Sequence, residues 1–264
     1  MMRRAATALI ALCLTAGHAF AWGASGHSIV AEIAQRRLMP AVMAKIGELI
    51  GPQASLASLS GWADDVAFTR PNTMAWHFVN IPYDSASYVP ERDCRQTPRG
   101  DCVVAAIERF RRVLSDTGAA REDRVEALKF LVHFVADAHQ PMHCAERNGD
   151  QGGNLLPVAF FGTRATLHAV WDIHIIERHS HDWGEWVREL EAKELVELGG
   201  RDGGTAVEWV EACHALAVSV AYAIPESAEL DSDYYAASLP VVRAQLALAG
   251  LRLAKTLNEA LSGE

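Results

Sequence analysis

The sequence lacks an excess of positive charge. Its 264 residues carry 24 Lys and Arg against 33 Asp and Glu, which gives a formal net charge of −9. This balance argues against a protein that grips duplex DNA through a broad basic face. It does not exclude an enzyme that carries its positive charge on bound metal. Low-complexity stretches are also absent and half of the residues are hydrophobic, so wholesale disorder is excluded.

Cysteine is scarce, with five residues and no CxxC motif, which argues against a cysteine-based zinc cluster. Cys94 and Cys102 bracket a turn-rich loop, and this spacing predicts a local disulfide in an oxidising compartment. Cys144 and Cys213 lie far apart in the sequence, which leaves open whether they pair. The absence of an Asn-x-Ser/Thr sequon favours a bacterial, periplasmic product.

Long hydrophobic runs are missing outside the N-terminus, where residues 1–21 have the pattern of a signal peptide. Arg3 and Arg4 precede an apolar run that is too short to span a bilayer. The small residues Ala19 and Ala21 fit the cleavage rule, so we expect cleavage before Trp22. The mature domain would then cover residues 22–264. We expect an exported protein, periplasmic or extracellular, that forms no stable association with a membrane.

Apolar residues follow a helical period over most of the chain. Strand character is confined to Asn154–Phe161, which we interpret as one arm of a hairpin. Residues 72–99 and 145–153 are expected to be loops. No repeat, linker or composition break divides the chain, so we predict an all-α, single-domain helical bundle with one short β-hairpin. The predicted helices cover Ser28–Leu38, Ala41–Ile50, Asp101–Leu114, Arg121–Ala138, Thr166–Arg178, Trp183–Leu198, Thr205–Ala223 and Tyr234–Leu261.

Histidine is plentiful, with eleven residues, and two predicted helices carry a histidine followed four residues later by an aspartate. His133 and Asp137 share one helix face, and His168 and Asp172 repeat the spacing on a second helix. His143 follows the first pair just beyond Pro141. A single pair of this kind is usually a surface hydrogen bond. Two pairs among apolar neighbours indicate a site for two metal ions, because imidazole and carboxylate are zinc ligands.

Further candidate ligands lie upstream. His27 follows the predicted cleavage site closely, Asp64 belongs to a Trp-Ala-Asp sequence, and His77 lies between Trp76 and Phe78. Each is weak evidence alone, because a histidine near aromatic residues is more often an ordinary core residue.

Taken together, the ordered motifs resemble the S1/P1 nuclease family of secreted, zinc-dependent, single-strand-specific phosphodiesterases. The bacterial zinc phospholipases C are more distant relatives of that family. The most specific parts are the string HFxxDxHQPxH at 133–143 and the cleavage site before a tryptophan. The remaining motifs are His27, WAD at 62–64, WHF at 76–78, GGN at 152–154 and HxxWD at 168–172.

The resemblance implies three Zn²⁺ ions per chain. One ion would be held by Asp64, His77, His133 and Asp137, and a second by His143, His168 and Asp172. The third would take the free amino group and carbonyl of Trp22, together with His27 and the bridging Asp137. A terminal amine can ligate only after the signal peptide is cut, so export and activation would be coupled.

The resemblance also implies a function. We expect an endonuclease with 3′-nucleotidase activity that hydrolyses RNA and single-stranded DNA to 5′-phosphate products by means of a zinc-activated hydroxide. Asp64, Asp137 and Asn154 would serve catalysis. Phe78, Asn80 and Asn154 would contact the substrate, with Phe78 stacking on an unpaired base. Single-stranded nucleic acid or nucleotides would be the only partners of a monomer.

Two positions depart from the pattern of the family. Ala67 stands where members often carry an arginine, and Asn80 stands where many carry an aspartate. Asp65, Arg70 or Asp84 are the candidates to replace that acid–base pair. Two other functions stay open on the sequence: a zinc phospholipase C that acts on lipid phosphodiesters, and a periplasmic zinc-binding protein with impaired catalysis.

Overall fold

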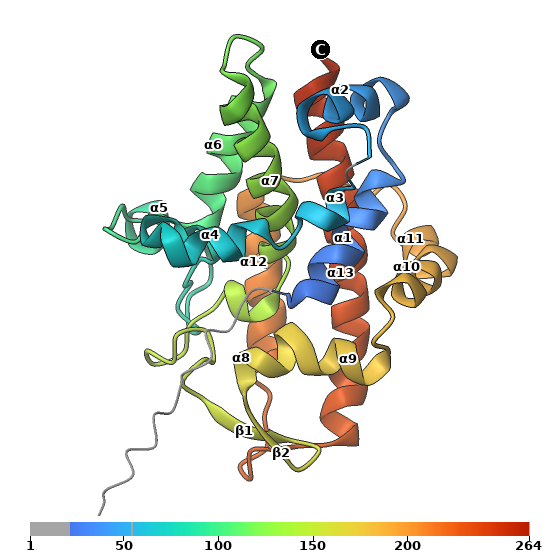
Figure 1. Ribbon diagram of the computed structural model, residues 1–264. Coiled ribbons are helices and arrows are strands. Elements are labelled where there is room, and N and C mark those ends of the chain that lie inside the picture. The colour runs from blue at the N-terminus through green and yellow to red at the C-terminus, as the bar shows by residue number, and fades with distance from the viewer. Residues whose placement is uncertain (1–21, 54, 264) are drawn as a thin grey trace, which may run out of the picture.

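A computed structural model describes residues 22–53 and 55–263, so the predicted signal peptide lies outside the described residues. The described part is mostly helical, which confirms the all-α fold class (Figure 1). The longer helices are α1 (Ala24–Gln35), α2 (Pro40–Ile50), α4 (Trp62–Thr69), α6 (Val103–Ser115), α7 (Arg121–Asp137), α10 (Trp183–Ala192), α12 (Ala206–Leu216) and α13 (Ser232–Ser262).

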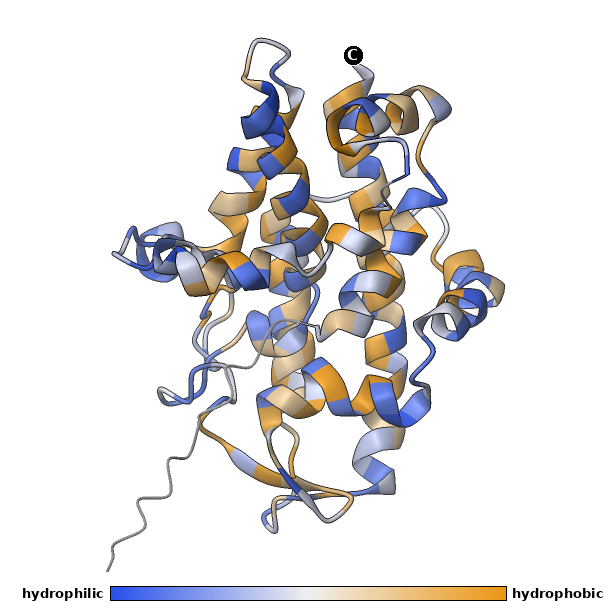
Figure 2. Ribbon diagram, viewed as in Figure 1, coloured by the Kyte–Doolittle hydropathy of each residue, from blue (hydrophilic) through white to orange (hydrophobic). Residues whose placement is uncertain are grey.

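The long helix α13 runs along nearly the whole molecule, and α1 packs against its middle (Figure 1). Gly250 of α13 permits this approach, because a Cβ at that position would lie 2.7 Å from the Cβ of Ile33 on α1. Helices α6 and α7 form a second pair beside them. Each long helix carries both apolar and polar residues (Figure 2), as expected of helices that share one core.

Helix α7 is the central helix of the bundle and contacts α1, α2, α4, α6 and α13. Its C-terminal half is buried on all sides, from Phe130 to Asp137. Phe130 and Phe134 stack on each other with ring centroids 5.1 Å apart. The sequence predicted a single apolar stripe here, but neighbours cover every face of this half of the helix. His133 and Asp137 therefore project into the core rather than into solvent.

Several short helical elements differ from the predicted boundaries. The predicted loop 72–99 contains most of the 3-10 helix η1 (Pro71–His77) and all of α5 (Pro90–Asp93), each with a proline in its first turn. Helices α3 (Leu56–Leu59) and α4 were not predicted, because they are too short to show a clear period. The shorter elements also include the 3-10 helix η2 (Pro141–His143), α8 (Leu167–Ala169), η3 (Val170–His174), α9 (Ile175–His179), α11 (Glu194–Glu197) and η4 (Ala217–Ala221).

The predicted hairpin is present, but it is shifted and gains a third strand. β1 (Pro157–Phe160) pairs antiparallel with β2 (Thr163–Thr166), so the strand begins three residues later than predicted. β3 (Glu229–Leu230) adds parallel to β1 on its other side. A strand of two residues has no sequence period, which explains why it was not predicted. The sheet lies at one end of the bundle, below α8 and α9 in Figure 1.

The disulfide between Cys94 and Cys102 is confirmed, with Cα atoms 5.0 Å apart. Cys144 and Cys213 are both buried free thiols and form no disulfide with each other. This answers the question that the sequence left open. Among residues 22–53 and 55–263, no helix combines the length and the apolar character that crossing a membrane requires.

Candidate metal centre

Helices α1, α4 and α7 and the end of η1 bring four imidazole and carboxylate groups around Asp137. The Oδ2 atom of Asp137 lies 3.1 Å from Nδ1 of His77 and 3.3 Å from Nε2 of His133. Its Oδ1 atom lies 3.4 Å from Nε2 of His27. Asp64 approaches from α4, with Oδ1 3.3 Å from the same His133 nitrogen. Asp137 thus faces His27 with one oxygen and His77 and His133 with the other, while the rings of His27 and His133 stack with centroids 3.8 Å apart.

A second group lies next to the first and consists of His143, His168 and Asp172. The two Nε2 atoms of His143 and His168 are 3.1 Å apart, and Nε2 of His168 is 3.1 Å from Oδ2 of Asp172. Nδ1 of His143 lies 4.0 Å from Oδ1 of Asp137, so the two groups adjoin. Asp172 lies in η3, a π-helical turn that continues α8. Turns of this kind are frequent at functional sites.

Backbone carbonyls fix the orientation of three of these histidines. Nδ1 of His133 donates to the carbonyl of Ser60 at 2.6 Å, and Nδ1 of His143 donates to that of His77 at 2.8 Å. Nδ1 of His168 donates to the carbonyl of Gly152 at 2.6 Å. In each ring the proton on Nδ1 leaves the Nε2 lone pair free to face the cluster. This arrangement is typical of metal-ligating histidines.

Gly152 is required for the contact with His168. Its φ of +61° lies in the left-handed region, and a Cβ there would collide with the carbonyl of Met142. The GGN motif therefore has a structural role in orienting His168, in addition to the substrate contact that the sequence predicted for Asn154.

The electrostatics of the first group are strongly coupled. Burial alone would raise the pKa of Asp137, but attraction to His133 and hydrogen bonds from His133 and His77 place this pKa below its ordinary value. Burial opposes the charge on His133, yet Asp137 and Asp64 raise its pKa well above the usual value. Burial and the neighbouring His133 lower the pKa of His27 to about 3. Protons and a cation therefore compete for the same donor atoms.

Several buried polar atoms of the two groups have no hydrogen-bond partner among the described residues. They are both ring nitrogens of His27, Nε2 of His77, Oδ1 of Asp137 and Oδ2 of Asp172. Leaving such atoms unsatisfied costs about 1–3 kcal/mol each. Metal ligation would satisfy those that face the cluster. Donor atoms lie within 4.8 Å of one another in three sets of residues: His27 with Asp64 and His133, His77 with His133 and Asp137, and His143 with His168 and Asp172. The nitrogen and oxygen donors fit Zn²⁺.

Trp22 lies beside both groups. Its side chain is fully buried, and its indole Nε1 donates to the carbonyl of Ala136 at 3.0 Å, one residue before Asp137. The next residue, Gly23, donates its backbone N–H to the carbonyl of Asp172 at 2.8 Å. The start of the predicted mature domain is therefore anchored between α7 and η3. Ligation by the amine of Trp22 stays a prediction.

The predicted substrate-contacting residues surround the second group and His77. Nδ2 of Asn154 donates to the carbonyl of Gln151 and lies 3.1 Å from Nδ1 of His168. Phe78 and Asn80 are half-buried and flank the buried Val79. The N–H of Val79 donates to the carbonyl of His143 at 2.8 Å. The segment after His77 therefore runs along the residues that carry His143.

The position of the absent arginine is filled by the buried Ala67, one turn after Asp64 on α4. Arg70 does not replace that arginine, because its guanidinium forms a two-point ion pair with Glu126 at 2.8 and 3.0 Å. Asp65 and Asp84 are exposed, and no contact of either with the cluster is present in the described part of the chain.

His139 lies within the HFxxDxHQPxH string between Asp137 and His143, and it is fully buried. It points away from the cluster: Nδ1 donates to the carbonyl of Val135 at 2.7 Å, and Nε2 accepts from Arg252 at 2.7 Å. Sequence reasoning did not assign the carbonyls of Ser60 and Gly152, because a backbone oxygen leaves no signature in residue type.

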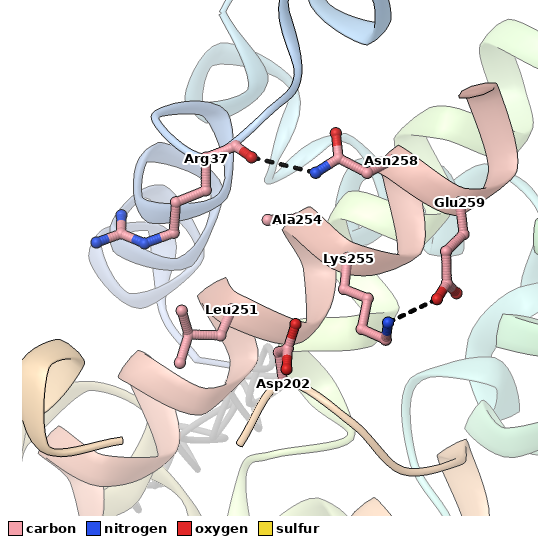
Figure 3. Close-up of a pocket in the computed structure, with 7 residues that line it drawn as sticks. All are labelled: Arg37, Asp202, Leu251, Ala254, Lys255, Asn258 and Glu259. Carbon is pink, nitrogen blue, oxygen red and sulfur yellow. Dashed lines mark hydrogen bonds and ion pairs between the residues drawn. The ribbon is translucent and has the colours of Figure 1, made fainter. Parts of the chain in front are cut away.

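The pocket shown in Figure 3 is separate from the cluster and shares no residue with it. It has a volume of about 290 Å³ and lies between Arg37 and the C-terminal part of α13. Lys255 and Glu259 pair at 2.7 Å, and Nδ2 of Asn258 donates to the carbonyl of Arg37 at 3.1 Å. In the described part of the chain, the grouped histidine and carboxylate donors lie elsewhere.

Comparison with known proteins identifies the family of the chain. The family model described as S1/P1 Nuclease matches residues 22–262. Endonuclease 2 of Arabidopsis thaliana is 32% identical over 266 residues, which covers 90% of this chain and 89% of the relative. Nuclease P1 of Penicillium citrinum is 30% identical over 267 residues, with 90% and 97% covered. Nuclease S1 of Aspergillus oryzae is 28% identical over 268 residues, with 90% and 91% covered. The chain belongs to the S1/P1 nuclease family, whose members hydrolyse nucleic acids.

Proposed function

We propose that this protein is a zinc-dependent endonuclease with 3′-nucleotidase activity that hydrolyses RNA and single-stranded DNA to 5′-phosphate products. The observation that carries the proposal is the pair of adjoining, buried His/Asp groups, in which several nitrogen and oxygen atoms lack a hydrogen-bond partner among the described residues. Membership of the S1/P1 nuclease family supports the substrate class.

Three zinc ions would occupy the site. His77, His133, Asp64 and Asp137 would hold one, and His143, His168 and Asp172 would hold another. His27 and Asp137 would hold the third, together with the amine and carbonyl of Trp22. The position of His27 supports this division, because its Nε2 faces the Asp137 oxygen that His77 and His133 do not use.

The charges of the proposed site favour an anionic substrate. Three zinc ions bring six positive charges against the three carboxylates of Asp64, Asp137 and Asp172. The centre is then positive within a chain whose net charge is −9. A local positive centre attracts a phosphodiester without the basic surface that the sequence lacks.

Zinc at such a centre supplies a Lewis acid for the phosphate and activates water near neutral pH. The residues of the chain hold the reactants in place. Asp137 lies between the histidines of two zinc sites, and Asp64 completes one of them. Asn154 lies beside His168 and would donate the second N–H of its amide to a phosphate oxygen. Phe78 directly follows His77, so a base stacked on its ring would lie next to the reacting phosphate. Stacking requires an unpaired base and tolerates any sequence, which favours single strands.

The same proposal includes an exported, monomeric protein without stable membrane association, cleaved before Trp22. The disulfide between Cys94 and Cys102 fits an oxidising compartment. Cleavage there would create the free amine that the third zinc site requires.

Comparing substrates before and after chelation tests the proposal. Single-stranded DNA, RNA, duplex DNA and a choline phospholipid are each incubated with the mature protein, with chelator, and with zinc restored. We expect cleavage of the two single-stranded substrates, 5′-phosphate ends, loss of activity with chelator and recovery with zinc. Hydrolysis of the phospholipid alone would make the protein a phospholipase C. Zinc retention without any hydrolysis would indicate the impaired enzyme that the departures at Ala67 and Asn80 leave open.

A further inference from the structure

Gln140 is fully buried next to the second His/Asp group, and its amide orientation is fixed by its partners. Its Oε1 accepts from the backbone N–H of Met142 at 2.5 Å. A backbone nitrogen can only donate, so the opposite side of the amide must be the NH₂ group. That group donates to Oδ1 of Asp172 in a short hydrogen bond.

The hydrogen bond from Gln140 occupies one of the two carboxylate oxygens of Asp172. The other oxygen, Oδ2, is buried without a hydrogen-bond partner and faces Nε2 of His168 at 3.1 Å. Asp172 therefore keeps only Oδ2 without a hydrogen bond, whereas Oδ1, which lies 3.8 Å from Nε2 of His143, accepts from Gln140.

Gln140 also shapes the turn that carries His143. Its side chain caps the first turn of η2 through Met142, and its backbone carbonyl accepts from the N–H of His143 at 2.9 Å. One buried side chain therefore links two members of the group, His143 through the turn and Asp172 through its carboxylate.

We propose that Gln140 is a positioning residue that makes Asp172 a one-oxygen ligand and sets the affinity of the metal held by His143, His168 and Asp172. The inference rests on the proposed function in one respect, namely that this group holds zinc. Outer partners of metal ligands typically change metal affinity by about 10- to 100-fold.

Two variants of Gln140 separate the two roles of its side chain. Gln140→Glu keeps an oxygen that accepts from Met142, but it replaces the NH₂ group by a second carboxylate oxygen facing Asp172. The amide hydrogen bond to Asp172 is thereby lost, and two buried carboxyl groups face each other. Gln140→Leu removes both interactions. Gln35→Leu is the matched control, because Gln35 also accepts a backbone N–H, that of Leu56 at 2.7 Å, away from the metal centre.

The measurement is the zinc retained per chain after equilibration with graded concentrations of a chelator. We expect both Gln140 variants to lose one zinc at a chelator concentration about 10- to 100-fold lower than the wild type requires. Gln35→Leu should retain zinc like the wild type. The double variant Gln140→Glu with Asp172→Asn should lose no more zinc than Asp172→Asn alone, because both act on the same ion.

Each other outcome points to one failure. If Gln140→Glu retains zinc like the wild type while Gln140→Leu does not, the side chain only caps the turn and the inference is wrong. If the wild type and Asp172→Asn bind the same number of zinc ions per chain without chelator, this group does not hold zinc. In that case the proposed function fails instead.

Discussion

Replacing Asp137 should weaken two metal sites at once, whereas replacing Asp172 should weaken one. Asp137 faces His77 and His133 with one oxygen and His27 with the other. Among the described histidines, those that face the carboxylate of Asp172 are His143 and His168 of the second group. The two carboxylates are both buried and both follow a histidine by four residues, so Asp137→Asn and Asp172→Asn form a matched pair.

The size of the effect follows from the lost charge. At a separation of about 4 Å and an effective dielectric constant near 20, the attraction between two unit charges is about 4 kcal/mol. A divalent ion would double this attraction, which sets an upper bound. The asparagine carbonyl oxygen can still ligate, so we take about 4 kcal/mol for each zinc that Asp137 contacts. Each dissociation constant should then rise about 10³-fold, since 1.4 kcal/mol is a factor of ten.

The assay is zinc content at buffered free zinc, set about 30-fold above the wild-type dissociation constants. The wild type should retain three ions, Asp172→Asn two and Asp137→Asn one. Circular dichroism at the same zinc level shows whether each variant is folded. Equal losses in the two folded variants would refute the bridging position of Asp137.

Three further predictions concern single residues. Phe78→Ala should raise KM for single-stranded DNA roughly 5- to 150-fold, which corresponds to the loss of one stacked base. Hydrolysis of a small phosphodiester without a base should not change. Steady-state kinetics that show equal losses on both substrates would contradict this. Cys144 and Cys213 should react with a thiol reagent only after unfolding, because both are buried and burial raises the pKa of Cys144. Rapid labelling of the native protein, or no labelling of either cysteine after unfolding, would contradict this. Burial and Arg252 lower the pKa of His139 to about 3, so the unfolded chain binds a proton below about pH 6.5 that the folded one does not. The metal-free wild type should therefore lose about 1.4 kcal/mol of stability per pH unit from this group between pH 6.5 and 3, and His139→Gln should lose less in urea unfolding; parallel curves would show that His139 does not contribute.

The parts of the site that the sequence predicted are those with a helical spacing. His133 with Asp137 and His168 with Asp172 lie on shared faces as the four-residue spacing requires, even though the second pair spans a π-helical turn. The predicted disulfide is another local feature, because its cysteines are eight positions apart in the sequence. The family resemblance brought in His27, His77 and Asp64, whose approach to Asp137 depends on how three separate elements pack.

The features that the sequence did not predict depend on tertiary contacts. The carbonyls of Ser60 and Gly152 orient two histidines, and any residue type has a carbonyl. Arg70 was a candidate to replace the arginine that is absent at position 67, but its guanidinium forms an ion pair with Glu126 of α7. No local sequence pattern connects these two residues. Gln140 lies inside the most specific motif, yet only the fold shows that its amide reaches Asp172, which is 32 residues away.

The most direct test of the central claim is the rate of single-stranded DNA cleavage as zinc is titrated into metal-free protein that begins at Trp22. We expect no cleavage without zinc and full activity only when three equivalents of zinc are bound. Duplex DNA should be cleaved little at any zinc level. Cleavage that persists in the metal-free protein, or full activity at one equivalent, would contradict the claim.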